Sequence, residues 1–81
     1  FILTVSHLYR YKKIEKLVAA YRLLGDEVRD IPLLIVGQPF DRPYVEELRR
    51  AADEVDAKII FTGSLGPATL AALMSACRLF V

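Results

Sequence analysis

Cysteine, long apolar runs and an excess of charge of one sign are all scarce in this 81-residue sequence. Its single cysteine, Cys77, cannot form an internal disulfide, which suits a reducing compartment. No apolar run approaches the roughly 20 residues that a membrane-spanning helix needs. The formal net charge is +1 and no long run of one sign occurs, which argues against a general binder of nucleic acid or anionic membranes. We therefore expect a cytoplasmic protein with no nucleic-acid partner.

Two glycine signatures of nucleotide binding are also absent. The first apolar run is not followed by Gly-x-Gly-x-x-Gly, and Gly-x-x-x-x-Gly-Lys-Ser/Thr does not occur. The common dinucleotide-binding and P-loop fingerprints are therefore missing. One histidine, His7, and one cysteine form no Cys/His cluster in the sequence, so we expect no metal site.

Apolar residues are plentiful and make up 54% of the sequence. A domain usually has about 100–150 residues, and a shorter chain buries only roughly 60% of its unfolded surface. Residues 1–3 and 79–81 are apolar and typical of the middle of a buried strand. We therefore expect residues 1–81 to form one Rossmann-like unit that is truncated at both ends.

Four short apolar runs alternate with three segments of helical periodicity. The runs, which we expect to be strands, are residues 1–5, 33–36, 58–62 and 79–81. Continuous apolar strands are typical of parallel sheets with both faces buried. The βαβαβαβ order, with its right-handed crossovers, predicts an α/β fold whose Rossmann-like parallel sheet has the strand order 3-2-1-4.

Each helical segment carries an apolar stripe with the spacing of an amphipathic helix. Gly25 is the expected stop of the first helix. Asp41 is the expected N-cap of the second, with Pro43 in its first turn, and the third is expected to begin at Pro67. The stripes, expected to be buried, are Ile14, Leu17, Val18, Tyr21 and Leu24; Val45, Leu48, Ala52 and Val55; and Leu70, Leu73, Met74 and Cys77.

Ligands of open parallel sheets bind beyond the carboxyl ends of the strands. The loop at residues 6–13 combines a hydroxyl and an imidazole with the cations Arg10, Lys12 and Lys13. The following helix adds amide N–H groups and the positive end of its dipole. Together these groups can hold a diphosphate. A solvated basic loop is the alternative, and spacing alone leaves both open.

Glycines end the second and third apolar runs, at Gly37 and Gly63. A glycine at a strand end permits a tight turn and the close approach of a ligand. Turn chemistry alone is the simpler interpretation of each, and it is the one we favour from the sequence.

Four stretches taken together carry a resemblance to a known family. They are Ile-Leu-Thr-Val-Ser-His-Leu at residues 2–8 followed by Lys12, Leu-Leu-Ile-Val-Gly at 33–37, Ile-Ile-Phe-Thr-Gly at 59–63 and Ala-Cys-Arg-Leu-Phe-Val at 76–81. Their order and spacing over essentially the whole chain resemble the C-terminal domain of the retaining glycosyltransferases called group 1, or family 4. That family has the GT-B arrangement of two Rossmann-like domains.

The resemblance implies roles for several loop residues. In the family the first strand ends in Gly-Arg and a Lys-Gly follows, and the Arg and Lys grip the diphosphate of the donor. Lys12 matches that lysine, whereas Lys13 replaces the glycine and Ser6 and His7 stand where Gly-Arg is usual. A neutral histidine offers one donor and no fixed charge, where arginine gives a charged fork. Arg10 is the cation that can compensate.

Two further loops match those that border the nucleotide in the family. Their residues here are Gly37, Gln38, Gly63, Ser64 and Leu65, and Ser6 is expected to border the nucleotide with them. The resemblance implies a hexosyltransferase of carbohydrate biosynthesis that uses a nucleotide-sugar donor and no cofactor, in the cytoplasm or at the cytoplasmic face of a membrane. The acceptor domain, the rest of the C-terminal domain and its paired glutamates are expected outside these residues.

Two expectations concern the 81 residues by themselves. We expect them to be inactive as a transferase and to self-associate through the open edge of the fourth strand. A different class of function stays open beside the enzyme, namely a non-catalytic Rossmann-like binding or regulatory module, because one fold serves many functions.

Overall fold

A computed structural model describes residues 1–9, 12–23, 30–53 and 58–81 of the chain. Strands and helices alternate along it as expected, and each expected strand matches an observed one to within one residue at either end. The elements are β1 (Ile2–Val5), α1 (Ile14–Leu23), β2 (Leu33–Val36), α2 (Arg42–Asp53), β3 (Ile59–Gly63), α3 (Pro67–Ala76) and β4 (Leu79–Phe80).

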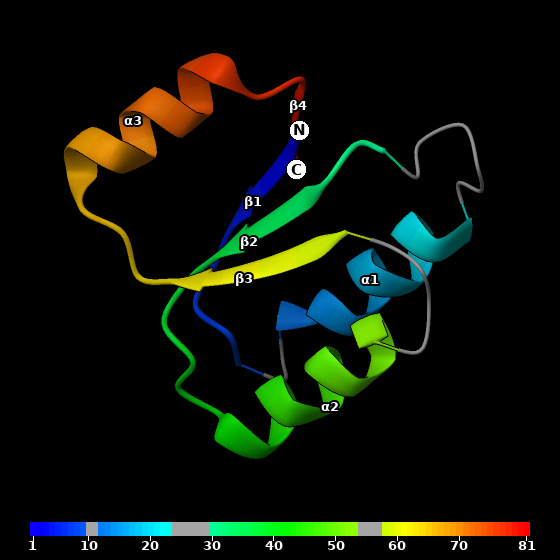
Figure 1. Cartoon of the computed structure of the whole chain (residues 1–81). Helices are drawn as coiled ribbons and strands as arrows, with labels where there is room; N and C mark the ends of the chain where they lie inside the picture. The colour runs from blue at the N-terminus through cyan, green and yellow to red at the C-terminus, as the bar shows by residue number, and fades with distance from the viewer. Residues whose placement is uncertain (10–11, 24–29, 54–57) are drawn as a thin grey trace.

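The strands form one sheet in the order β3-β2-β1-β4, and every neighbouring pair is parallel (Figure 1). The predicted α/β class and strand order are confirmed. Pairing between β2 and β3 shifts register near its end, so that Ile35 lies opposite Phe61 and Val36 opposite Gly63. The irregularity absorbs one extra residue, Thr62, and brings the glycine to the end of the ladder.

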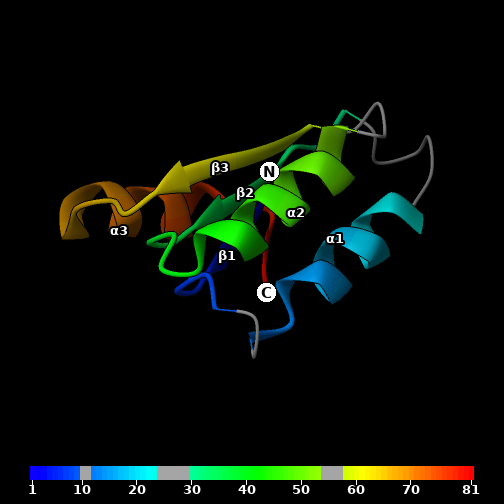
Figure 2. The same ribbon diagram turned by 90° about the horizontal axis from the view of Figure 1, so that it is seen from below.

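Helices α1 and α2 lie side by side and cover one face of the sheet (Figure 2). Alternate strand residues such as Ile2, Leu33 and Ile35 point to this face and join the buried core. The predicted stripes of the two helices are confirmed as far as the structure describes them. Ile14, Val18, Tyr21, Val45, Leu48 and Ala52 are buried, Leu17 is partly buried, and Leu24, Gly25 and Val55 lie outside the described residues.

The expected start of α2 is also confirmed. The Asp41 carboxylate accepts a hydrogen bond from the Tyr44 amide at 3.2 Å, and the Asp41 carbonyl accepts one from the Val45 amide at 3.0 Å. Asp41 is therefore the N-cap of a helix whose second residue is Pro43.

The predicted burial of α3 is wrong. This helix does begin at Pro67, but none of its residues is buried and Met74 is 49% exposed. Its leucines, Leu70 and Leu73, are only half-buried, as is Cys77 beyond its end. The reason is visible in Figure 1, where α3 stands apart from α1 and α2 with the strands between them. Nothing in the described part of the chain packs against its outer side.

Burial of both faces of every strand, expected from the continuous apolar runs, is likewise wrong. Ile60 in the edge strand β3 is 48% exposed, and Leu79 and Phe80 in β4 are 55% and 49% exposed. These residues lie at the two edges of the sheet, beyond the cover that the described helices give to the central strands. The central strands β1 and β2 hold the fully buried Leu3, Leu33 and Ile35.

Candidate functional site

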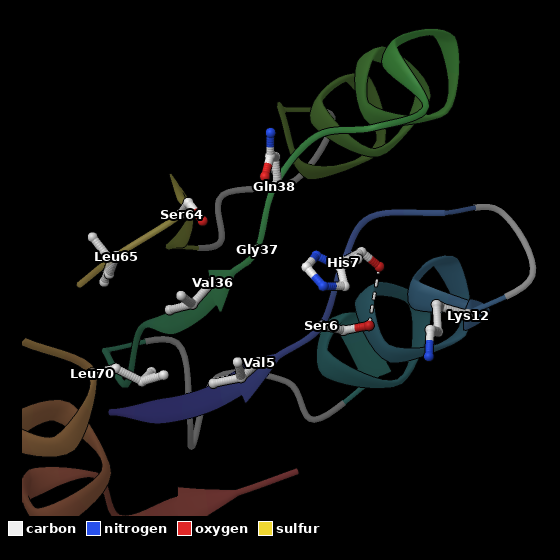
Figure 3. A pocket seen from close by; sticks show the side chains of 10 residues that line it. All are labelled: Val5, Ser6, His7, Lys12, Val36, Gly37, Gln38, Ser64, Leu65 and Leu70. Atoms are coloured by element: carbon white, nitrogen blue, oxygen red, sulfur yellow. Dashed lines mark hydrogen bonds between the residues drawn. The ribbon is translucent and has the colours of Figure 1, made fainter. Parts of the chain in front are cut away.

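The loops that follow the carboxyl ends of β1, β2 and β3 lie at the same end of the sheet and surround a cavity of about 360 Å³. Most of the residues predicted for the site line it, namely Ser6, His7, Lys12, Gly37, Gln38, Ser64 and Leu65. Figure 3 shows Ser64 and Leu65 on one side and Lys12 on the other, with His7 and Gly37 between them. The predicted residue Gly63 immediately precedes this lining, and Arg10 lies outside the described residues.

Three apolar residues of the lining were not predicted: Val5, Val36 and Leu70. Val5 and Val36 are the last residues of β1 and β2, and Leu70 is in the first half of α3. The rule that ligands bind beyond strand ends already pointed to the two valines. Only the placement of α3 over this corner brings Leu70 to the cavity.

The loops around the cavity are joined by backbone hydrogen bonds, so the strand pairing continues beyond the strands. The bonds run from Ser6 N to Val36 O (2.9 Å), from Gly37 N to Gly63 O (3.1 Å) and from Leu8 N to Gln38 O (3.0 Å). The Ser6 hydroxyl donates to the His7 carbonyl at 3.0 Å (Figure 3). The floor of the cavity is therefore a connected framework of backbone.

Gly37 is required by the protein chain itself. A Cβ atom built there would lie 1.6 Å from the Ser6 carbonyl oxygen and 2.6 Å from the Ser6 carbonyl carbon. The loop after β1 therefore crosses directly over Gly37. Gly63 differs, because its φ is +74° and a Cβ atom there would meet nothing within 4 Å. The glycine allows a left-handed turn here. This agrees with turn chemistry, the interpretation that the sequence favoured.

His7 belongs to an aromatic cluster with Tyr9 and Phe40. The rings of Tyr9 and Phe40 stack with centroids 5.0 Å apart and planes 4° apart, and His7 meets Phe40 edge-on at 5.1 Å. Such contacts restrict a ring's orientation. The His7 imidazole, which lines the cavity, is thus oriented by Phe40 in the loop between β2 and α2. Phe40 was not among the predicted site residues. An aromatic side chain close after a strand end was the available signal.

Lys12 and Lys13 lead into α1. The Lys12 amide donates to the Tyr9 carbonyl at 3.0 Å, and the Lys13 carbonyl accepts from the Lys16 amide at 3.0 Å. Lys13 has a φ of 61°, in the left-handed region that favours glycine. The turn before α1 is therefore of a type that favours glycine, although a lysine occupies it.

The first turn of α1 is fastened to α2. Tyr44, only 1% exposed, accepts a hydrogen bond from the Glu15 amide at 3.0 Å, and its hydroxyl donates to the Glu15 carboxylate. Two early amides of α1, at Glu15 and Lys16, are therefore occupied within the protein. The expectation that α1 offers its N-terminal amides to a ligand does not hold for these two.

The protonation of this pair follows from its surroundings. Burial, with the hydrogen bond to Glu15, raises the pKa of Tyr44 to about 12. The same hydrogen bond lowers the pKa of Glu15 below its ordinary value, against a smaller opposing effect of desolvation. The proton thus stays on the phenol and the charge on the carboxylate, where the positive end of the α1 dipole favours it.

Two features of the described residues bear on wider classes of function. Within residues 1–9, 12–23, 30–53 and 58–81, no three His, Cys, Asp or Glu side chains gather as a metal ion would require. In the same part of the chain, no helix has both the length and the apolar character of a membrane span.

Comparison with known proteins adds a family. The family model described as glycosyl transferases group 1 matches residues 1–81. Two curated sequences, both named serotype-specific mannosyltransferase WbdA and both from Escherichia coli, are each 32% identical to the chain over 84 residues. Each match covers 100% of the chain and 10% of the relative. The chain thus spans about a tenth of the length of the curated relatives that it matches.

Proposed function

Since this chain belongs to the group 1 glycosyl transferases, we propose that its cavity binds the diphosphate and nucleotide of a nucleotide-sugar donor. The observation that carries the proposal is the convergence of three strand-end loops on one cavity with Lys12 at its rim. This is the place where open parallel sheets bind nucleotides. Lys12, His7 and other polar side chains line the cavity, and backbone hydrogen bonds join the loops that form its floor.

The chemistry of glycosyl transfer gives these groups a task. Negative charge builds on the diphosphate as the bond from the donor sugar breaks. A fixed cation near that charge, such as the ammonium of Lys12, stabilises the transition state more than the bound donor. Lys12 and His7 are the described candidates for the phosphates, with Arg10 a third. Gly37, Gln38, Gly63, Ser64 and Leu65 border the nucleotide. No cofactor or metal ion is needed if side chains supply the charge.

The finer features follow from the resemblance. We place the chain in the C-terminal domain of a GT-B enzyme, as one truncated unit that needs an acceptor domain and further residues for activity. We assign it to retaining hexosyltransferases of the cytoplasm or of the cytoplasmic face of a membrane. Because both relatives are named mannosyltransferases, a mannosyl donor is the first donor to test.

The experiment is steady-state kinetics of the full-length protein with Lys12→Ala and the donor varied. Loss of one charge-assisted contact costs about 1.5–3 kcal/mol, so kcat/KM should fall roughly 10- to 150-fold. If the contact strengthens as charge develops, kcat falls together with donor affinity.

Lys16→Ala is the matched control. Lys16 is an exposed lysine in the first turn of α1, close after Lys12 in the sequence, but it does not line the cavity. We therefore expect kcat/KM to stay near that of the unmodified protein. Wild-type efficiency in Lys12→Ala, with the fold intact by circular dichroism, would leave the solvated-loop interpretation standing. A full-length protein that binds nucleoside diphosphates but transfers no sugar would favour the binding module.

A further inference from the structure

A tyrosine outside the cavity joins the two segments that carry its polar lining. Tyr44 lies in the first turn of α2, which follows the loop of Gly37 and Gln38, and Glu15 lies in the first turn of α1, which follows Lys12. Their contact is two-way, amide to phenol and phenol to carboxylate. Neither residue is part of the cavity lining.

The α2 side of this contact is firmly held. Tyr44 is 1% exposed and Leu48, one turn further on, is 1% exposed as well. The Asp41 cap bonds the amide of Tyr44 itself. A side chain buried in a close-packed core has little freedom to shift. The phenol oxygen of Tyr44 is therefore a fixed point relative to which α1 can be positioned.

The α1 side is a short segment held at both ends. Glu15 follows Lys12 by only three residues, and between them Ile14 is 5% exposed in the core. The bonds from Lys12 N to Tyr9 O and from Lys16 N to Lys13 O bracket the segment. A hydrogen bond to the amide of Glu15 therefore constrains where the backbone of Lys12 lies relative to the opposite wall of the cavity.

We propose that Tyr44 is a positioning residue for donor binding: through Glu15 it fixes the first turn of α1 and thereby holds Lys12 against the phosphates. The proposal rests on the proposed function, since it concerns how the phosphate-binding lysine is held. Its consequence is specific. Removing the phenol oxygen should weaken binding of the charged diphosphate and leave binding of the uncharged nucleoside unchanged.

The test is Tyr44→Phe in the full-length protein, with calorimetric affinities for a nucleoside diphosphate and for the corresponding nucleoside. We expect the diphosphate affinity to fall about three- to tenfold, a size typical of indirect coupling between neighbouring residues. Equal losses for the diphosphate and the nucleoside would overturn the proposal, because they would show a general loss of structure.

Tyr21→Phe is the matched control. Tyr21 is also a buried tyrosine, 5% exposed, and its hydroxyl bonds the Ile31 carbonyl from the far part of α1. Its loss removes a comparable hydrogen bond away from Lys12 and should leave the diphosphate affinity unchanged. A loss as large as that of Tyr44→Phe would mean that any weakening of α1 suffices, and would overturn the proposal.

A double-mutant cycle shows whether Tyr44 acts through the lysine. If it does, adding Tyr44→Phe to Lys12→Ala should cause no further loss of diphosphate affinity, whereas full additivity would overturn the proposal. Wild-type affinity in Tyr44→Phe beside a weakened Lys12→Ala would overturn this inference alone. Wild-type affinity in Lys12→Ala would overturn the proposed function, and this inference with it.

Variants of Glu15 keep the test usable if Tyr44→Phe does not fold. Glu15 is exposed, so its substitution leaves the core intact. Glu15→Gln keeps an acceptor oxygen for the phenol and should bind the diphosphate like the unmodified protein. Glu15→Ala removes the acceptor and should lose about two- to threefold. Identical affinities in Glu15→Gln and Glu15→Ala would contradict the positioning role.

Discussion

Lys13 adopts a backbone conformation that an L-residue with a side chain adopts at a cost. Its φ is 61°, and this left-handed conformation costs a residue other than glycine about 1–2 kcal/mol. Glycine avoids that cost but loses more chain entropy on folding, which offsets about 0.5–1 kcal/mol of the gain. Lys13→Gly should therefore stabilise the full-length protein by about 0.5–1 kcal/mol, measured by urea unfolding. Lys13→Ala, which removes the charge but keeps the Cβ atom, should give no such gain. An equal gain from alanine would show that the charge was responsible.

Single residues also mark where sequence reasoning ended. That Gly37 mattered was predictable, because a glycine directly after an apolar run is typical of a strand end. That its hydrogen faces the Ser6 carbonyl was not, because the contact joins residues 31 positions apart and depends on the register of β1 and β2. The conformation of Lys13 was hidden for a related reason, since lysine is not a residue from which a left-handed turn is expected.

At the scale of elements, the contact between α1 and α2 should make the free energy of unfolding fall at alkaline pH. In the unfolded chain Tyr44 titrates near pH 10, whereas in the folded protein its pKa is raised to about 12. Between these values the unfolded state loses the proton and the folded state keeps it. The contribution to stability, on the order of 2 kcal/mol, is thus fully present below pH 10 and is lost as the pH rises towards 12.

The measurement is urea unfolding of the full-length protein and of Tyr44→Phe from pH 9 to pH 11.5. Burial also raises the pKa of Tyr21, but that residue is common to both proteins and cancels in the difference. The stability of the unmodified protein should fall more steeply with pH. Parallel curves would show that Tyr44 titrates normally and that its bond to Glu15 is weak.

The elements themselves were largely predictable, and their burial was not. Alternating apolar runs and amphipathic segments indicate parallel βαβ units, so the strand order and the buried stripes of α1 and α2 could be derived. The periodicity of α3 is poorer, because alanines surround Leu70 and Leu73 on several sides, and its burial depends on partners that periodicity does not specify. The bond between Glu15 and Tyr44 was beyond reach as well, since it joins two helices whose packing follows only from the sheet.

At the scale of the whole molecule, the cover over the sheet is uneven. Helices α1 and α2 close one face over the central strands. Large apolar side chains stay about half exposed on α3 and at the edge strand β4, namely Met74, Leu79, Phe80 and Val81. Among the described strands β4 is also an edge, paired with β1 alone. An apolar edge strand is a template for pairing with another chain.

We therefore predict that the 81-residue chain, expressed alone, self-associates through the side of α3 and β4. Sedimentation velocity should show a weight-average mass that rises with protein concentration. Phe80→Lys places a charge on the edge strand and should shift the chain towards monomer, because buried charge opposes strand pairing. Phe40→Lys is the control: Phe40 is 47% exposed but lies beside His7 at the cavity, so its substitution should leave association unchanged. A monomer at all concentrations, or an equal response to both substitutions, would refute this surface as the site of association.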